Sequence, residues 1–211
     1  MTKKGILFDM DGTLINTYEN INFRQALSEL KTVQKTLILK ILKSRVRSFA
    51  EMETRILQEV EDPAEGKELV RRVSDFLLEH YDNAPLKKDA LMFLQYVKQK
   101  NYKICLCTNN ATEIVSHILR EKHMEAYFDY VITSQQVTRS KPDPQMYLEA
   151  LHNIDLTAED CIVFEDTDNG VMAARNAGID VIVVNDKEKR KYSDALMTIR
   201  DFGDYRLYQE F

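Results

Sequence analysis

The sequence has no long apolar run, few cysteines and no excess of positive charge, and each of these shortages argues against a class of protein. No apolar stretch among its 211 residues approaches the length of about 20 that a membrane-spanning helix needs. The basic start is followed by too few apolar residues, before the first aspartate, for a secretory signal peptide. The net charge of −5 gives no support to a general role in binding nucleic acid or an anionic membrane.

The cysteines are odd in number and lie in apolar, strand-like segments, at Cys105, Cys107 and Cys161. Such thiols are more typical of core residues in a reducing compartment than of disulfides. Cys105 and Cys107 have no nearby cysteine or histidine partner, so they make a poor zinc pattern. We therefore expect a cytoplasmic protein, and the content of 44% hydrophobic and 30% charged residues suits a globular chain of one or two domains.

The order of the apolar patterns predicts an α/β fold. A short continuous apolar run at 5–8 indicates a buried strand, and strand-like and helix-like segments alternate after residue 85. Further strands are predicted at 102–107, 130–133, 161–164 and 180–184, with helices at 86–100, 111–122, 144–153 and 169–177. This alternation implies right-handed βαβ units and a Rossmann-like, doubly wound parallel sheet.

Residues 16–85 contain no strand-like run, and they are too many for a loop. Their apolar residues recur at helical spacing and predict about four helices, one of which starts at Asp62-Pro63. We therefore predict a core of residues 1–15 and 86–211, with an α-helical cap domain, residues 16–85, inserted after the first strand. Aromatic residues spaced by three in the tail are expected to pack back onto the core, namely Phe202, Tyr205, Tyr208 and Phe211.

Two aspartates, Asp9 and Asp11, follow the first predicted strand directly. In an open α/β sheet, ligands bind at the carboxyl ends of the strands. Paired carboxylates in one crevice repel each other unless a cation or a proton offsets their charge, so the pair suggests a metal site or acid/base catalysis. The alternative is an ordinary Asp-Gly turn, because both residue types are common in turns.

Later strand ends also carry polar residues. Thr108 and Asn109 precede a predicted helix, where a hydroxyl and backbone amides can hold a phosphate. Lys141, fixed in a turn by prolines, can supply a positive charge, and Glu165 and Asp166 again place carboxylates at a strand end. Taken singly, each segment has a structural explanation as a helix cap, a turn or a partner of a helix dipole.

Together and in this order, the segments resemble the haloacid dehalogenase-like hydrolase superfamily. The motifs are DxDGT at 9–13, Thr108, Lys141 in Lys-Pro-Asp-Pro, and EDTxxG at 165–170. A helical cap inserted after the first motif is the arrangement of the β-phosphoglucomutase-like and phosphoglycolate-phosphatase-like members.

The resemblance implies a role for each motif residue. Asp9 attacks phosphorus and forms an aspartyl-phosphate, while Asp11 protonates the leaving oxygen and later deprotonates the attacking water. Mg²⁺ is held by the Asp9 carboxylate, the Asp11 backbone carbonyl and Asp166, with Glu165 in or near its coordination shell.

The remaining motif residues are implied to bind phosphate or to support the turns. Thr108, Asn109 and Lys141 hold the phosphoryl oxygens, and Lys141 also neutralises Asp9. Thr13 is implied to support Asp11. Asp168 and Asn169 are expected to cap the helix that follows them rather than to bind a ligand.

The resulting expectation is a Mg²⁺-dependent phosphatase for a small phosphorylated metabolite. Asp11 argues against a dehalogenase, because dehalogenases of this superfamily lack the second aspartate. A phosphosugar mutase is the first alternative, although Asn22 stands before Phe23-Arg24 where mutase-like members tend to carry a histidine. A non-catalytic binding protein on the same fold is the second alternative.

The predicted cap carries a run of basic residues. Between positions 31 and 47 there are six lysines and arginines and no acidic residue. One interpretation is a solvated helix face. The other is that Arg45 or Arg47 faces the crevice and attracts a second anionic group of the substrate.

Overall fold

The computed structural model describes residues 3–17, 30–43, 49–185, 192 and 195–211. Among these residues, no helix combines the length and the apolar character needed to cross a bilayer.

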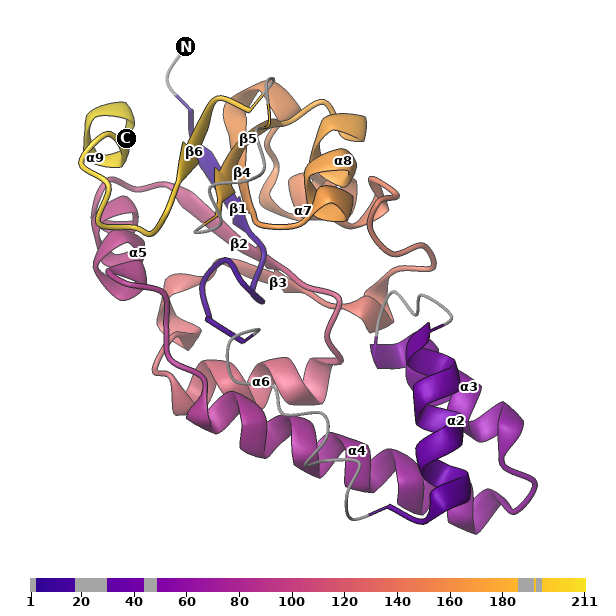
Figure 1. Ribbon diagram of the computed structural model, residues 1–211. Coiled ribbons are helices and arrows are strands. Elements are labelled where there is room, and N and C mark those ends of the chain that lie inside the picture. The colour runs from indigo at the N-terminus through magenta and orange to yellow at the C-terminus, as the bar shows by residue number, and fades with distance from the viewer. Residues whose placement is uncertain (1–2, 18–29, 44–48, 186–191, 193–194) are drawn as a thin grey trace.

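A six-stranded sheet, parallel throughout, forms the centre of the described structure (Figure 1). Its spatial order is β3-β2-β1-β4-β5-β6, the order of a doubly wound fold. The strands are β1 (Gly5–Phe8), β2 (Lys103–Cys107), β3 (Tyr130–Ile132), β4 (Cys161–Glu165), β5 (Asp180–Val184) and β6 (Met197–Ile199). The five strands predicted from the sequence are confirmed. The sixth, β6, is not among the predicted strands, and it is formed by parallel pairing with β5.

The core helices are α5 (Ala90–Gln99), α6 (Thr112–Glu121), α7 (Gln145–Ile154), α8 (Asp168–Asn176) and α9 (Leu207–Glu210). Short 3₁₀ turns lie at η1 (Glu125–Tyr127), η2 (Ser134–Gln136) and η3 (Ala158–Asp160). The helix predicted at 86–100 begins four residues late, at Ala90, because Leu86 forms an antiparallel bridge with Ile15 that holds the chain extended. The other three predicted helices agree with the structure to within one residue at each end.

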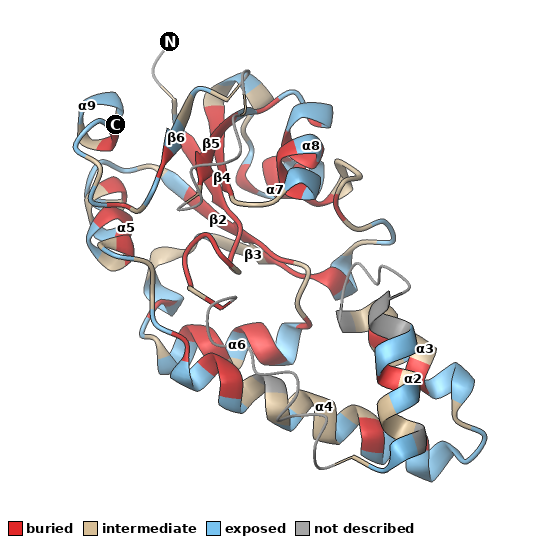
Figure 2. Ribbon diagram, viewed as in Figure 1, coloured by how far each residue is buried: buried red, intermediate tan, exposed pale blue. Residues whose placement is uncertain are grey.

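Helices cover both faces of the sheet, and alternate strand residues supply the two cores. Along β1, Ile6 and Phe8 belong to the core under α5 and α6, whereas Leu7 belongs to the core under α7 and α8. In Figure 2 the central strands are coloured mostly as buried, whereas the helices beside them alternate between buried and exposed residues.

The C-terminal tail closes the first of these cores, as predicted. Phe202 is completely buried and stacks on Phe93 with ring centroids 5.3 Å apart. Tyr208 and Phe211 also contact the Phe93 ring edge-on. Tyr205 is the exception, because it is 70% exposed.

Between β1 and the remainder of the sheet the chain forms α2 (Thr32–Lys43), α3 (Phe49–Glu59) and α4 (Pro63–Asn83). The predicted start of α4 is confirmed, because the Asp62 side chain accepts a hydrogen bond from the Ala64 amide and Pro63 is the first helical residue. In Figure 1, α2 and α3 pack on the end of α4 that is remote from the sheet. They share a small apolar core, composed of Ile38, Met52, Ile56 and Leu69.

The other end of α4 is attached to α6. The Lys122 ammonium, just after α6, donates hydrogen bonds to the carbonyls of Asp82 (3.0 Å) and Ala84 (2.7 Å) at the end of α4. His117 Nε2 lies 2.8 Å from the Asp82 carboxylate. These contacts fix the last turn of α4 relative to the sheet.

Candidate active site

The predicted site residues converge at the carboxyl ends of β1, β2 and β4. The strand order reverses between β1 and β4, and ligands of doubly wound sheets bind at such a reversal. Asp9 follows β1, Glu165 is the last residue of β4, and Asp166 comes next. The fold therefore brings together carboxylates that are more than 150 residues apart in the sequence.

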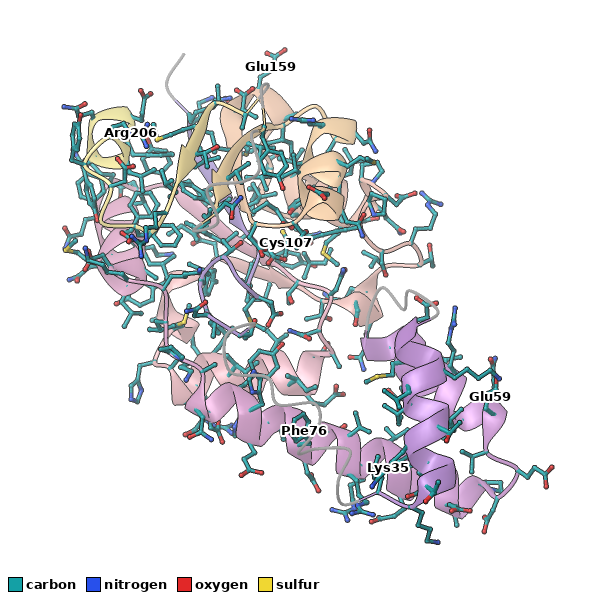
Figure 3. All side chains as sticks on the ribbon, viewed as in Figure 1. Lys35, Glu59, Phe76, Cys107, Glu159 and Arg206 are labelled. Carbon is teal, nitrogen blue, oxygen red and sulfur yellow. The ribbon has the colours of Figure 1, made fainter. Side chains whose placement is uncertain are left out.

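The Lys141 side chain connects three of the strand ends. Its ammonium donates to Asp9 Oδ1 at 2.7 Å, to Glu165 Oε1 at 2.7 Å and to the Cys107 carbonyl at 2.9 Å. Cys107 lies at the middle of the molecule in Figure 3. Because an ammonium has three protons, all of them are used here. Lys141 is 2% exposed and Glu165 is fully buried, so water screens these charges little.

The charged side chains around Lys141 shift one another's pKa values. Burial by itself lowers the pKa of Lys141, but the carboxylates of Asp9 and Glu165 outweigh it and hold this pKa well above its ordinary value. Burial raises the pKa of Asp9, and repulsion from Glu165 adds to the rise, while Lys141 opposes it. The group thus contains more negative charge than one ammonium neutralises.

Backbone and hydroxyl donors hold the Glu165 carboxylate in place. Its Oε1 accepts from the Tyr147 hydroxyl at 3.1 Å, in addition to Lys141. Its Oε2 accepts from the Asp166 amide at 3.0 Å and from the amide and hydroxyl of Thr167 at 3.1 Å each. Both oxygens are therefore already occupied by donors from the chain.

A metal ion fits the arrangement of the acidic residues. Asp9, Glu165 and Asp166 each offer an oxygen, and these oxygens lie within 4.8 Å of one another. Burial, followed by repulsion from Glu165, raises the pKa of Asp166 to about 8. Crowded carboxylates with raised pKa values form a donor set suited to a hard divalent cation. Since the Glu165 oxygens already accept hydrogen bonds, Asp9 and Asp166 are the more available ligands.

Two other side chains hold the Asp11 carboxylate in place. The Tyr81 hydroxyl donates to its Oδ1 at 2.6 Å, and Asn110 Nδ2 donates to its Oδ2 at 2.6 Å. Burial raises the pKa of Asp11, and the hydrogen bond from Tyr81 acts against the rise. Sequence reasoning missed Tyr81, because a tyrosine in the last turn of a predicted helix carries no signal of contact with a distant aspartate.

The segment after β2 contains Thr108 and Asn109, the residues predicted to hold phosphate. Thr108 is 1% exposed, and its hydroxyl accepts from the Asn110 amide at 3.2 Å. The buried Oδ1 of Asn109 has no hydrogen-bonding partner in the described part of the chain. Such unpaired buried polar atoms are uncommon in folded proteins.

The Thr13 hydroxyl lies 3.5 Å from Asp166 Oδ1, and its expected support of Asp11 stays a prediction. The expectation that Asp168 and Asn169 cap the following helix is wrong. Helix α8 is capped by Thr167, whose hydroxyl accepts from the Gly170 amide at 3.1 Å, and not by the two residues after it. A threonine places its oxygen at the required distance from the third amide of the helix.

The two arginines proposed for substrate binding, Arg45 and Arg47, lie outside the described residues. Two other cations of the same basic run form ion pairs. Lys40 Nζ lies 2.7 Å from the carboxylate of Glu59, which Figure 3 labels on α3. Lys31 Nζ lies 3.8 Å from Glu65. Both pairs are exposed, as expected of a solvated helix face.

Comparison with known proteins places this α/β core and its acidic strand ends in a family. A family model described as haloacid dehalogenase-like hydrolase matches residues 6–184, and the chain belongs to this family. The chain is 32% identical over 188 residues to the phosphorylated carbohydrates phosphatase of Thermotoga maritima, a match that covers 85% of this chain and 83% of that protein.

Solved structures with the same fold extend over nearly the whole chain. CbbY from Rhodobacter sphaeroides, in complex with phosphate, has a TM-score of 0.74 at 22% identity, with 96% of each chain covered. The hydrolase YfnB from Bacillus subtilis, bound to magnesium, has a TM-score of 0.75 at 18% identity and covers both chains completely. At these identities the likeness establishes the fold.

Proposed function

We propose that this protein is a Mg²⁺-dependent phosphatase that hydrolyses a small phosphorylated metabolite through an aspartyl-phosphate at Asp9. The observation that carries the proposal is the buried contact between Lys141 and Asp9 within the acidic group at the strand ends. A phosphorylated carbohydrate is the first substrate class to consider, because it is the one named for the Thermotoga maritima relative.

In the first step, a carboxylate oxygen of Asp9 attacks phosphorus, and the bond between phosphorus and the ester oxygen breaks. Lys141 orients Asp9 through its Oδ1 and shields its charge from the incoming dianion. Asp11 gives its proton to the leaving oxygen. Thr108 and Asn109 hold the phosphoryl oxygens at the end of β2.

In the second step, water attacks the phosphorus of the aspartyl-phosphate. Asp11, now a carboxylate, takes a proton from this water, the acyl-phosphate bond breaks, and Asp9 is regenerated together with inorganic phosphate. The same residue thus acts as an acid and then as a base, and the site returns to its initial state.

We assign Asp9 and Asp166 as side-chain ligands of Mg²⁺, with the Asp11 backbone carbonyl as a further ligand and Glu165 close to the ion. When bound, Mg²⁺ offsets the excess negative charge and polarises the phosphoryl group. The raised pKa values of Asp9 and Asp166 support this assignment, because a cation favours their charged forms.

We further propose that residues 16–85 are a cap domain that selects the leaving group, with Arg45 or Arg47 attracting a second anionic group. A cytoplasmic location suits the three free, buried cysteines. If the arginine assignment holds, Arg47→Ala raises the KM for the true substrate far more than for a simple phosphate ester. Equal effects on both would rule it out.

Release of phosphate from a panel of phosphorylated metabolites, with Mg²⁺ or with EDTA, tests the main proposal. We expect turnover that requires Mg²⁺ and that Asp9→Asn abolishes. The panel includes β-glucose 1-phosphate, with formation of glucose 6-phosphate followed separately. Isomerisation without phosphate release would indicate a phosphosugar mutase. The Thermotoga maritima relative, at 32% identity, is named as a phosphatase and does not favour this alternative. No turnover by folded, metal-loaded protein would indicate a binding protein.

A further inference from the structure

The Asp11 carboxylate belongs to a closed ring of three hydrogen bonds. Tyr81 and Asn110 each donate to one of its oxygens, both at 2.6 Å, and Asn110 Nδ2 also donates to the Tyr81 hydroxyl at 2.8 Å. With both oxygens engaged by fixed donors, the plane and direction of this carboxylate are determined. None of the contacts in this ring involves Lys141 or Glu165.

The two donors come from different parts of the chain. Asn110 follows β2 and belongs to the sheet end that carries the site, where its carbonyl also accepts from the Ser134 amide and hydroxyl. Tyr81 lies in the last turn of α4, a helix that extends away from the sheet to α2 and α3 (Figure 1). The ring therefore joins α4 to Asp11 of the core.

Burial and neighbouring contacts hold the Tyr81 side chain in place. Its side chain is 6% exposed, and the helix end beside it is attached to α6 through Lys122 and Asp82. These contacts hold the Tyr81 hydroxyl beside Asp11, at the carboxyl end of β1. This distinguishes Tyr81 from residues on α2 and α3, which pack on the far end of α4.

We propose that Tyr81, together with Asn110, is a positioning residue that directs the Asp11 carboxyl toward the leaving group of the substrate. This inference depends on the proposed phosphatase function. It concerns only the first step, in which the phosphoryl group is transferred to Asp9 and the leaving oxygen is protonated. A residue that aims the proton donor matters most when the leaving oxygen needs a proton. Aliphatic alkoxides are such leaving groups, whereas para-nitrophenolate is a weak base that departs without one.

The alternative is that Tyr81 is only part of the core, since its ring lies in the main apolar cluster. Loss of the hydroxyl would then change stability, or change turnover of every substrate by the same factor. The dependence on the leaving group separates the two possibilities. The quantity to compare is kcat/KM, because it reports the steps up to transfer of the phosphoryl group to Asp9 and not the later hydrolysis.

The experiment compares Tyr81→Phe with the wild-type protein on para-nitrophenyl phosphate and on the best alkyl monoester of the metabolite panel, both with Mg²⁺. We expect kcat/KM for the alkyl ester to fall at least about tenfold, and that for the aryl ester to fall less than about threefold. Tyr96→Phe is the matched control, because the Tyr96 hydroxyl donates to the Tyr208 carbonyl in the core, at 3.4 Å, and touches no site residue. This control should match the wild type on both esters.

Equal losses on both esters, or no loss on either, would overturn the inference. Asn110→Ala supplies a second test, with the same selective loss expected, so that poor folding of one variant leaves the other to decide. Thermal unfolding of each variant shows whether it is folded at the assay temperature. Failure of the wild-type protein to release phosphate from any ester would instead overturn the proposed function.

Discussion

The ammonium of Lys141 and the carboxylate of Glu165 lie 2.7 Å apart, with 3% and 1% of their side chains exposed. Lys141 also donates to Asp9, so its charge stays paired with a carboxylate when Glu165 is replaced by a neutral residue. Glu165 is also the acceptor for Tyr147 and Thr167, so it organises the site through several contacts at once.

Glu165→Gln should therefore destabilise the protein by about 1–3 kcal/mol, because buried donors would lose an acceptor. A glutamine has one acceptor oxygen, and its amide group would face donors that now bind the carboxylate. Urea unfolding measures the change. Glu159→Gln, at an exposed position, is the control and should leave the free energy of unfolding almost unchanged. A stable Glu165→Gln protein with normal turnover would contradict this role for Glu165.

Gly170 is expected to tolerate no side chain. A Cβ at this position would lie 1.8 Å from the Glu165 carboxyl, so Gly170→Ala should displace Glu165 and cost about 1–3 kcal/mol together with much of the activity. Gly66→Ala is the matched control within α4, where the nearest atom would be 3.4 Å away. Because alanine favours helix, that change should stabilise the protein by up to about 1 kcal/mol. Thermal unfolding of both variants checks the contrast.

The free energy of unfolding should depend on pH in the acid range because Asp129 ionises there. Burial by itself raises the pKa of Asp129, but hydrogen bonds from the Ile104 amide (2.8 Å) and Lys98 (2.9 Å) outweigh it and hold the pKa below its ordinary value. A lowered folded-state pKa contributes stability above the unfolded-state pKa of about 3.9, and this stability is lost as the pH falls through the folded-state value.

The test is urea unfolding of Asp129→Asn and the wild type at pH 7 and below pH 3. We expect the variant to be less stable by about 1 kcal/mol at pH 7, from the loss of a charged hydrogen-bond acceptor, and the difference to shrink at low pH. Glu149→Gln, an exposed site on α7, should show no such convergence. A difference that stays constant with pH would disprove the link to ionisation.

The C-terminal tail should be required for a stable core. Phe202 is completely buried between Phe93 and Phe164, with ring centroids at 5.3 and 5.6 Å, so Phe202→Ala should cost about 3–5 kcal/mol. Tyr205→Ala, at a residue 70% exposed, should change stability by less than about 0.5 kcal/mol. Similar unfolding midpoints for the two variants would show that the tail is dispensable.

The sequence by itself determined the sheet, its helices and most of the acidic site. Apolar runs and helical spacings are local, so they predicted five strands of the sheet from neighbouring residues alone. Asp9, Lys141 and Asp166 could be selected because polar residues at the carboxyl ends of parallel strands must lie at one edge. The late start of α5 and the short β6 could not be predicted, since a bridge to Ile15 and pairing with β5 produce them.

Only the tertiary structure decided which side chains hold the predicted residues in place. Thr13 contacts Asp166, and Tyr81 contacts Asp11 across 70 positions of the sequence. A hydrogen bond requires two atoms to lie within about 3 Å in a suitable direction. Residue type and spacing along the chain cannot specify such a distance, because it depends on how α4 packs against α6 and the sheet.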